Sequence, residues 1–113
     1  MLDTLAEQGS ECIFILNKFS EVEYVSSSVK MFWRVCLNDI IGEKFPDLFS
    51  VKCENEKNFN DVMNELYMMR EWNGTFYVTY ALSDEYTFEY TFNVHAKPLT
   101  YGDGCDSFFC FHT

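Results

Sequence analysis

Cysteine and histidine side chains are the groups of this chain best suited to chemistry, because thiolates and imidazoles bind zinc and can pair as nucleophile and base. The 113 residues include five cysteines and two histidines. The cysteines are Cys12, Cys36, Cys53, Cys105 and Cys110. An odd number does not fit the paired disulfide framework of a small secreted domain. We therefore predict reduced thiols that are mostly buried.

Cys105 and Cys110 are the closest pair of cysteines in the sequence. Both fall in one predicted strand, where a spacing of five residues points the side chains to opposite faces, about 17 Å apart at ~3.3 Å per residue. The spacing therefore predicts that they do not share a zinc ion.

The histidines, His95 and His112, fall on consecutive predicted strands. If the turn between these strands pairs Pro98 with Cys105, His95 faces Phe108 and the histidines lie about 13 Å apart. This register predicts no metal site. His95 is expected on the polar face of its strand, either as a solvated or interface histidine or as a pH-responsive contact.

No group of residues predicts catalysis. Asp84 and Glu85 are adjacent acids, but they fall at a predicted hairpin tip, where nothing excludes water. The stretch 102–104, Gly-Asp-Gly, precedes no helix and carries an acid where a bound phosphate would lie, so it is interpreted as a loop. Neither histidine stands in a motif that would activate a nucleophile. We do not expect an enzyme.

The elements that position these residues follow from hydrophobic periodicity. Residues 86–96 alternate between apolar and polar side chains, as in a strand with one buried face. Its apolar, even-numbered residues should face the core. Strands are predicted at 11–17, 21–26, 74–82, 86–96 and 105–112, and helical segments at 29–36, 37–42, 44–49 and from 58 to about 70.

Composition predicts one globular domain over residues 1–113. Apolar residues make up 48% of the chain and aromatic residues 19%, with twelve Phe, so a rigid core of large rings is expected.

A net charge of −10 disfavours binding to nucleic acid or to an anionic membrane. No leader peptide and no apolar run near the roughly 18 residues of a membrane span is evident. The expected location is cytoplasmic.

Five segments in order resemble a PAS domain over nearly the full chain: "LDTLAEQGSECIFILN", "VEYVSSSVKMFW", "NDIIGEKFPDLF", "EWNGTFYV" and "FNVHAKPL". The resemblance implies an α+β fold in ββαααβββ order, with a five-stranded antiparallel sheet covered on one face by short helices and enclosing a small cavity. PAS domains are usually regulatory parts of longer signalling proteins, including two-component systems. The chain is therefore expected to be a fragment of such a protein.

The resemblance also allows the cofactors of the family to be checked. Flavin-binding members carry a reactive cysteine three residues after the glycine that matches Gly42, and this chain has Phe45 there. Haem-binding members of one branch supply a histidine from the long helix, and residues 58–70 contain none. A flavin–cysteine adduct and haem are therefore not expected. The cofactor stays unknown, and the chain could have none.

A ligand pocket is predicted on the inner face of the sheet, with tyrosine hydroxyls aimed into a cavity of Phe and Met side chains. The alternative is that the aromatic side chains fill this space themselves. The predicted pocket residues are Tyr24, Phe32, Met63, Leu66, Phe76, Val78, Tyr90 and Phe92. The predicted dimer or interaction surface comprises Leu2 and Leu5 of the first helix and His95 and Phe108 of the outer sheet face.

Three functions are compatible with this sequence. The first is a regulatory sensor module that couples a small molecule or a packing change in its cavity to homodimerisation or to an output domain. The second is a ligand-free dimerisation domain with a dry core. The third, ranked last, is a small α+β enzyme or carrier with a cone-like cavity. We expect no nucleic-acid partner and no membrane insertion.

Overall fold

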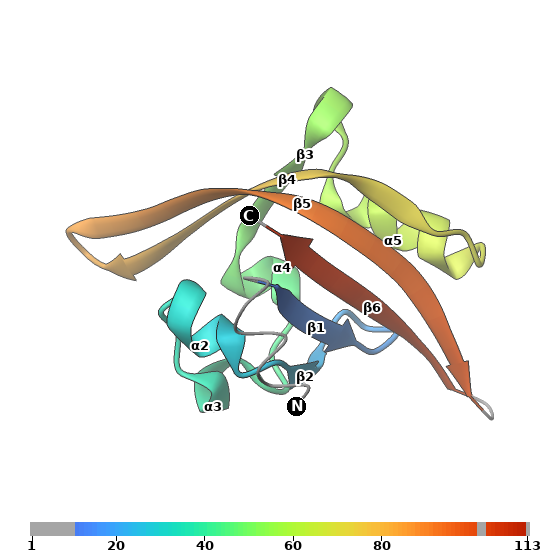
Figure 1. The fold of residues 1–113 in the computed structure, drawn as a ribbon, viewed down its shortest axis with the longest axis horizontal. Coiled ribbons are helices and arrows are strands. Elements are labelled where there is room, and N and C mark those ends of the chain that lie inside the picture. The colour runs from blue at the N-terminus through green and yellow to red at the C-terminus, as the bar shows by residue number, and fades with distance from the viewer. Residues whose placement is uncertain (1–10, 102–103, 113) are drawn as a thin grey trace.

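A single curved antiparallel sheet forms the framework of the protein. The computed structural model describes residues 11–101 and 104–112. The sheet has six strands in the order β2-β1-β6-β5-β4-β3 (Figure 1). The strands are β1 (Cys12–Leu16), β2 (Val22–Val25), β3 (Ser50–Cys53), β4 (Trp72–Ser83), β5 (Tyr86–Tyr101) and β6 (Gly104–His112). The predicted α+β class and antiparallel sheet are confirmed.

The predicted number of five strands is wrong by one, because β3 adds an edge strand. It pairs with β4 from Ser50 opposite Thr79 to Cys53 opposite Phe76. Cys53 falls between the helical segments predicted at 44–49 and from 58, where no strand was predicted. A strand of four residues with two exposed side chains has too short an alternation to be distinguished from a loop in the sequence.

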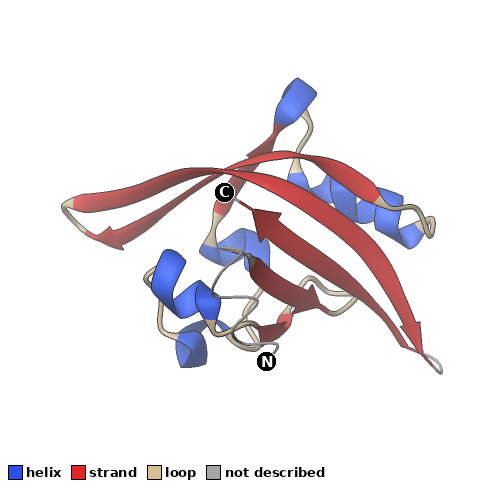
Figure 2. Ribbon diagram, in the orientation of Figure 1, coloured by secondary structure: helices blue, strands red, loops and turns tan. Residues whose placement is uncertain are grey.

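Short helices cover one face of the sheet (Figure 2). They are α2 (Ser28–Phe32), α3 (Leu37–Ile40), α4 (Phe45–Leu48) and α5 (Phe59–Tyr67), with one 3₁₀ turn, η1 (Glu54–Glu56). After α3, Gly42 has a φ of 87°, a left-handed conformation that favours glycine. No helix in the described residues is long and apolar enough to span a membrane.

The long helix α5 begins with a reciprocal cap. The Asp61 amide donates to Oδ1 of Asn58 at 3.0 Å, and the Asn58 amide donates to Oδ2 of Asp61 at 2.9 Å. The helix ends at Tyr67 rather than near Arg70, because Met69 has a φ of 62°. Its buried stripe packs toward the sheet and consists of Phe59, Val62, Met63 and Leu66.

The register of β5 and β6 differs from the prediction by two residues. Pro98 lies opposite Ser107, and His95 lies opposite Cys110 rather than Phe108. The strand β5 runs on to Tyr101, past its last partner in β4, which lies opposite Ala96. Beyond Ala96 only β6 pairs with β5 among the described residues, so Pro98 and its missing N–H lie on an edge and do not end the strand.

The predicted alternation of β5 is confirmed in its second half, where Phe92, Val94 and Ala96 are buried. Toward its start the same face becomes exposed, with Tyr86 57% and Tyr90 43% accessible. The end of the β4–β5 hairpin projects past the helices at the left of Figure 1, so the described residues cover that part of the inner face less than the rest.

Candidate functional site

Trp33 occupies the centre of the space between the helices and the inner sheet face, where a PAS-like cavity was expected. It caps the C-terminus of α2 and is fully buried. Its indole stacks on Phe92 with the ring centroids 4.9 Å apart and on Tyr80 with the centroids 6.1 Å apart. Four further rings meet it at steep angles, those of Phe14, Phe45, Phe49 and Phe111. This set, here called the Trp33 cluster, fills the space with interlocked aromatic side chains.

One polar contact ties the Trp33 cluster together. The Tyr80 hydroxyl donates a hydrogen bond to the backbone carbonyl of Trp33. Burial raises the pKa of Tyr80, so the hydroxyl stays protonated as a donor. The indole Nε1 of Trp33 makes no hydrogen bond of normal geometry with the described residues.

Most of the predicted pocket residues lie around this cluster. Phe32 is half-buried beside it. Five are buried in the same core, namely Met63, Leu66, Phe76, Val78 and Phe92. Met63 and Leu66 come from α5 and the other three from the sheet, and all five pack within the aromatic core. Whether any of them contacts a ligand stays a prediction.

The two remaining pocket tyrosines do not point into the core. Tyr24 lies opposite Ile15 on the outer sheet face and is 51% exposed, so its predicted orientation is wrong. A register shift between Ile15 and Leu16 leaves two successive residues of β2 exposed, which interrupts the simple alternation. Tyr90 has the predicted parity, but its ring stacks on Phe92 at 4.9 Å within the projecting hairpin.

A hollow of about 280 Å³ opens beside the Trp33 cluster, between the α2–α3 loop and β4. Its lining includes Arg34, Cys36, Ile40, Phe49, Tyr80 and Leu82. Arg34 takes a left-handed conformation, with a φ of 54°, in this loop. The sequence pattern did not reveal the hollow because a loop with no periodicity forms one wall.

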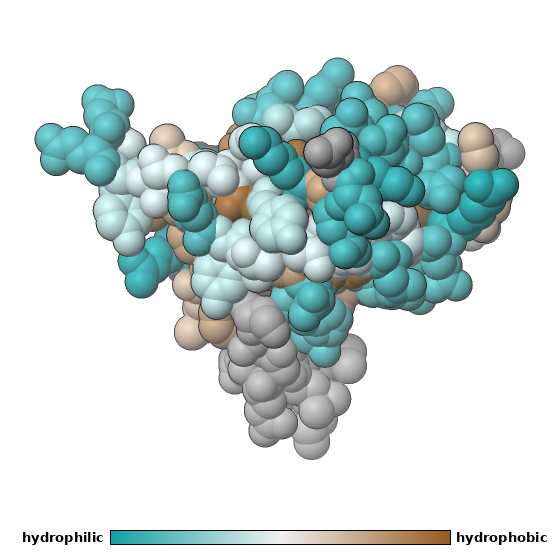
Figure 3. Space-filling model, turned by 90° about the horizontal axis from the view of Figure 1, so that it is seen from above, coloured by the Kyte–Doolittle hydropathy of each residue, from teal (hydrophilic) through white to brown (hydrophobic). Residues whose placement is uncertain are grey.

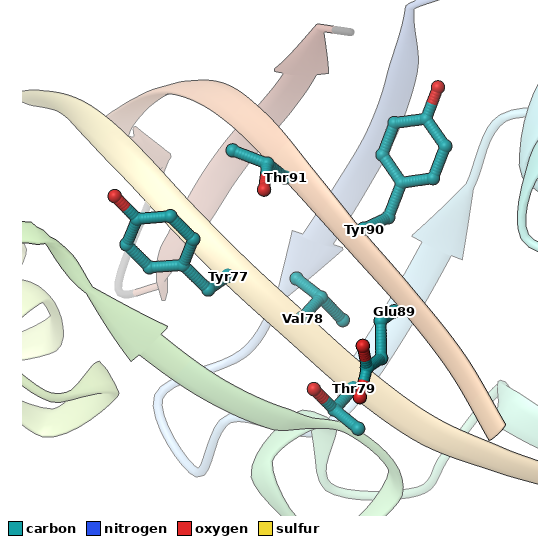
Figure 4. Close-up of a pocket in the computed structure, with 6 residues that line it drawn as sticks. All are labelled: Tyr77, Val78, Thr79, Glu89, Tyr90 and Thr91. Carbon is teal, nitrogen blue, oxygen red and sulfur yellow. The ribbon is translucent and has the colours of Figure 1, made fainter.

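A second, shallower hollow follows the twisted β4–β5 ribbon (Figure 4). Tyr77 and Tyr90, two of its six lining residues, point away from one another in the close-up. Glu89 contributes the one charged group among these six. Because its polar groups do not converge on a point, this hollow lacks the arrangement of a binding or catalytic site. Seen from above, the surface over this hairpin is mostly hydrophilic or intermediate (Figure 3).

The predicted interaction residues that the structure describes lie on the outer face. The His95 ring places Nδ1 2.6 Å from Oδ1 of Asn73 and Nε2 3.2 Å from Oε1 of Glu71. Phe108 is half-buried, and Nζ of Lys97 lies 5.3 Å from its ring centroid. Leu2 and Leu5 lie outside the described residues.

None of the four cysteines whose side chains the structure describes forms a disulfide. Cys12, Cys53 and Cys110 are buried, as predicted, whereas Cys36 is exposed in the α2–α3 loop. Burial raises the pKa of Cys53 to about 11, and the nearby carboxylates of Asp61 and Glu54 add to the effect. Among these four thiols, Cys36 is therefore the one open to reagents in solution.

Solved structures with this arrangement share little sequence with the chain. No protein-family profile and no curated protein sequence matches it. The PAS domain of nitrogen regulation protein NR(II) from Vibrio parahaemolyticus has a TM-score of 0.72 at 10% identity, covering 100% of this chain and 97% of that one. The PAS domain of an HTR-like protein from Haloarcula marismortui has a TM-score of 0.66 at 14% identity, with coverages of 98% and 92%. A PAS domain from a two-component sensor histidine kinase has a TM-score of 0.63 at 12% identity, with coverages of 98% and 91%. At these identities the similarity is one of fold.

Proposed function

The chain has the PAS fold, and on this premise we propose that it is a regulatory module of a longer signal-transduction protein. It acts by changing the packing of its aromatic core and by protein–protein contacts, and it does no chemistry of its own. The observation that carries the proposal is the position of Trp33, which fills the inner face of the sheet.

A filled core favours signalling through packing over the binding of a large flat cofactor. Such a cofactor would have to displace the indole from its stack on Phe92 and Tyr80. Removing a buried Trp or Phe side chain from a core typically costs about 3–5 kcal/mol. The same rigidity lets a shift of α2 reach the sheet directly, because Trp33 ends that helix and contacts strands β1, β4, β5 and β6.

The outer face of β1, β2 and β6 is the proposed contact surface for a second copy of the chain or for an output domain. Ile15 lies opposite Tyr24 on one side and Phe108 on the other, so three neighbouring strands contribute one apolar or aromatic side chain each. Ile15 and Phe108 are half-buried and Tyr24 is exposed. A row of apolar and aromatic side chains across three strands is typical of a protein interface.

Small-molecule sensing is the second candidate, and the 280 Å³ hollow beside Tyr80 favours it. Its size suits a compact ligand. Arg34 and Asp39 offer one charge of each sign to polar groups of a ligand, while Ile40, Phe49 and Leu82 supply an apolar wall. Binding there would press on the Trp33 cluster through Phe49 and Tyr80, which both contact the indole.

Sedimentation velocity on the protein with its native flanking segments tests the first candidate. We expect a concentration-dependent dimer that Ile15→Glu on the outer face weakens by at least about tenfold, since a buried unpaired charge is costly. The matched control is Thr79→Glu, which introduces the same charge on the outer side of β4 and should leave the dimer unchanged. A wild-type protein that stays monomeric at all concentrations would contradict the dimer.

For the second candidate, the test is a ligand screen by thermal shift. It should yield a compound that raises the Tm of the wild type and does not raise the Tm of Arg34→Ala.

A further inference from the structure

Three side chains with different ligand atoms meet on the outer face of the sheet. Cys110 and His112 are two residues apart in β6, so they share a face. Glu11 immediately precedes β1, whose Cys12 lies opposite Phe111, and this register brings Glu11 beside His112. The cluster therefore depends on the pairing of the two ends of the chain's described part, and only the spacing of Cys110 and His112 is local in the sequence.

The ligand atoms of the three side chains are already close to one another. Sγ of Cys110 lies 3.4 Å from Nε2 of His112 and 3.8 Å from Oε2 of Glu11. Nδ1 of His112 lies 3.7 Å from Oε1 of Glu11. One ligand atom from each residue can be chosen so that all three lie within 4.8 Å of one another.

We propose that Glu11, Cys110 and His112 bind a divalent transition-metal ion of the zinc type. Zinc bonds of about 2.0–2.3 Å to sulfur, nitrogen and oxygen place neighbouring ligand atoms of a tetrahedron roughly 3.3–3.6 Å apart. With one ligand atom taken from each residue the separations reach up to 4.8 Å, so side-chain rotations must bring the widest pair closer before an ion is held. A thiolate and a carboxylate also balance the two charges of the ion.

Burial and exposure in this cluster suit a metal site. Cys110 is only 7% exposed. A thiol this buried is better suited to binding a metal ion than to attacking a substrate, which would have to reach it. The side chains of Glu11 and His112 are about two-fifths exposed, so an ion can enter from solvent. Three protein ligands leave the fourth tetrahedral position for water.

The neighbouring histidine provides an internal comparison. His95 lies directly opposite Cys110 in the β5–β6 pairing, yet its ring nitrogens face Asn73 and Glu71. It therefore lies outside the proposed ligand set. In the same way, Cys36 is an exposed thiol in the α2–α3 loop, on another part of the molecule.

The test is a titration of the tag-free, metal-free protein with Co²⁺, followed by competition with Zn²⁺. We expect one equivalent of Co²⁺ to give visible bands typical of tetrahedral coordination and a thiolate-to-cobalt charge-transfer band. Cys110→Ser should abolish the charge-transfer band, and His112→Asn should lower the affinity for Zn²⁺ by at least about tenfold. Cys36→Ser and His95→Asn should leave both measurements unchanged.

Glu11→Gln keeps the test valid if the β6 variants fail to fold, because this side chain is partly exposed at the start of β1. It should keep the thiolate band and weaken the binding of Zn²⁺ by at least about tenfold. Absence of a thiolate band in the wild-type protein, or a band lost in Cys36→Ser and retained in Cys110→Ser, would overturn the proposal. These outcomes are read from the bound metal and its thiolate band and not from the oligomeric state, so failure of the metal site and failure of the proposed dimer are distinguishable.

Discussion

The Trp33 indole lies nearly parallel to the Phe92 ring, with their planes 10° apart and their centroids separated by 4.9 Å. Trp33 comes from the end of α2 and Phe92 from the middle of β5, so this contact joins the helical layer to the centre of the sheet. The core of the protein is organised around this pair, which occupies the side of a PAS fold where a ligand cavity was expected.

Trp33→Ala should lower the free energy of unfolding by about 3–5 kcal/mol, because it empties the middle of a packed aromatic core. Urea denaturation measures this loss. Met31→Ala, in the same helix but 69% exposed, is the matched control and should change stability by less than about 0.5 kcal/mol.

Added indole should raise the Tm of Trp33→Ala and not that of the wild type, since it refills the cavity. A loss below 1 kcal/mol on truncation would show that this space is not tightly filled.

Tyr80→Phe should destabilise the protein by about 1–2 kcal/mol. The change removes the donor to the Trp33 carbonyl and leaves that buried oxygen without its partner. Tyr77→Phe deletes the same atom from a tyrosine of the same strand that is 47% exposed, so its stability should match the wild type. The measurement is the Tm of both variants by thermal unfolding. Equal Tm values would be inconsistent with a stabilising hydrogen bond from the Tyr80 hydroxyl to the Trp33 carbonyl.

The elements with strong periodicity were predictable from the sequence, and those set by pairing between distant segments were not. Alternation in 86–96 identified the buried face of β5, and hydrophobic periodicity identified a helix that starts near residue 58. Tyr24 was misplaced because a register shift beside Ile15 breaks the alternation on which the prediction relied. The β5–β6 register was wrong because it assumed that the turn pairs Pro98 with Cys105, whereas the pairing continues to Tyr101 opposite Gly104 and puts Pro98 opposite Ser107.

The candidate sites were harder to predict than the fold. The pocket residues were chosen by their position on the predicted strands and helices, but Trp33, which lies among them, was interpreted only as part of a helix. The cluster of Glu11, Cys110 and His112 carries one local signal, two ligand residues at a spacing of two in one strand. Its third member comes from the other end of the chain through the β1–β6 pairing, which one sequence does not reveal.

The buried thiol of Cys53 should make stability fall at high pH. Its pKa is about 11 in the folded protein and about 8.5 in an unfolded chain, so the unfolded state loses its proton first. The contribution is complete below about pH 8.5 and declines as the pH rises toward 11. Denaturation of wild type and Cys53→Ala at pH 7 and 10.5 measures it, and the variant should lose less stability over this interval. An equal decline in both proteins would refute the assignment.

The reciprocal cap of α5 should contribute about 1 kcal/mol. Asn58→Ala removes the side chain that accepts from the Asp61 amide, so the free energy of unfolding should fall by this amount. Asn60→Ala, an exposed position inside the same helix, should be neutral or slightly stabilising because Ala has the higher helix propensity. If Asn60→Ala costs as much as Asn58→Ala, the loss reflects the helix as a whole rather than its cap.

Native mass spectrometry of the protein as purified, with its native flanking segments, tests the central claim most directly. The account predicts a dimer whose mass equals two polypeptide chains plus any small metal ion, because the Trp33 cluster fills the space of a larger ligand. A stoichiometric organic compound retained in the spectrum would contradict the filled core. A strictly monomeric species at every concentration would contradict signalling through a dimer.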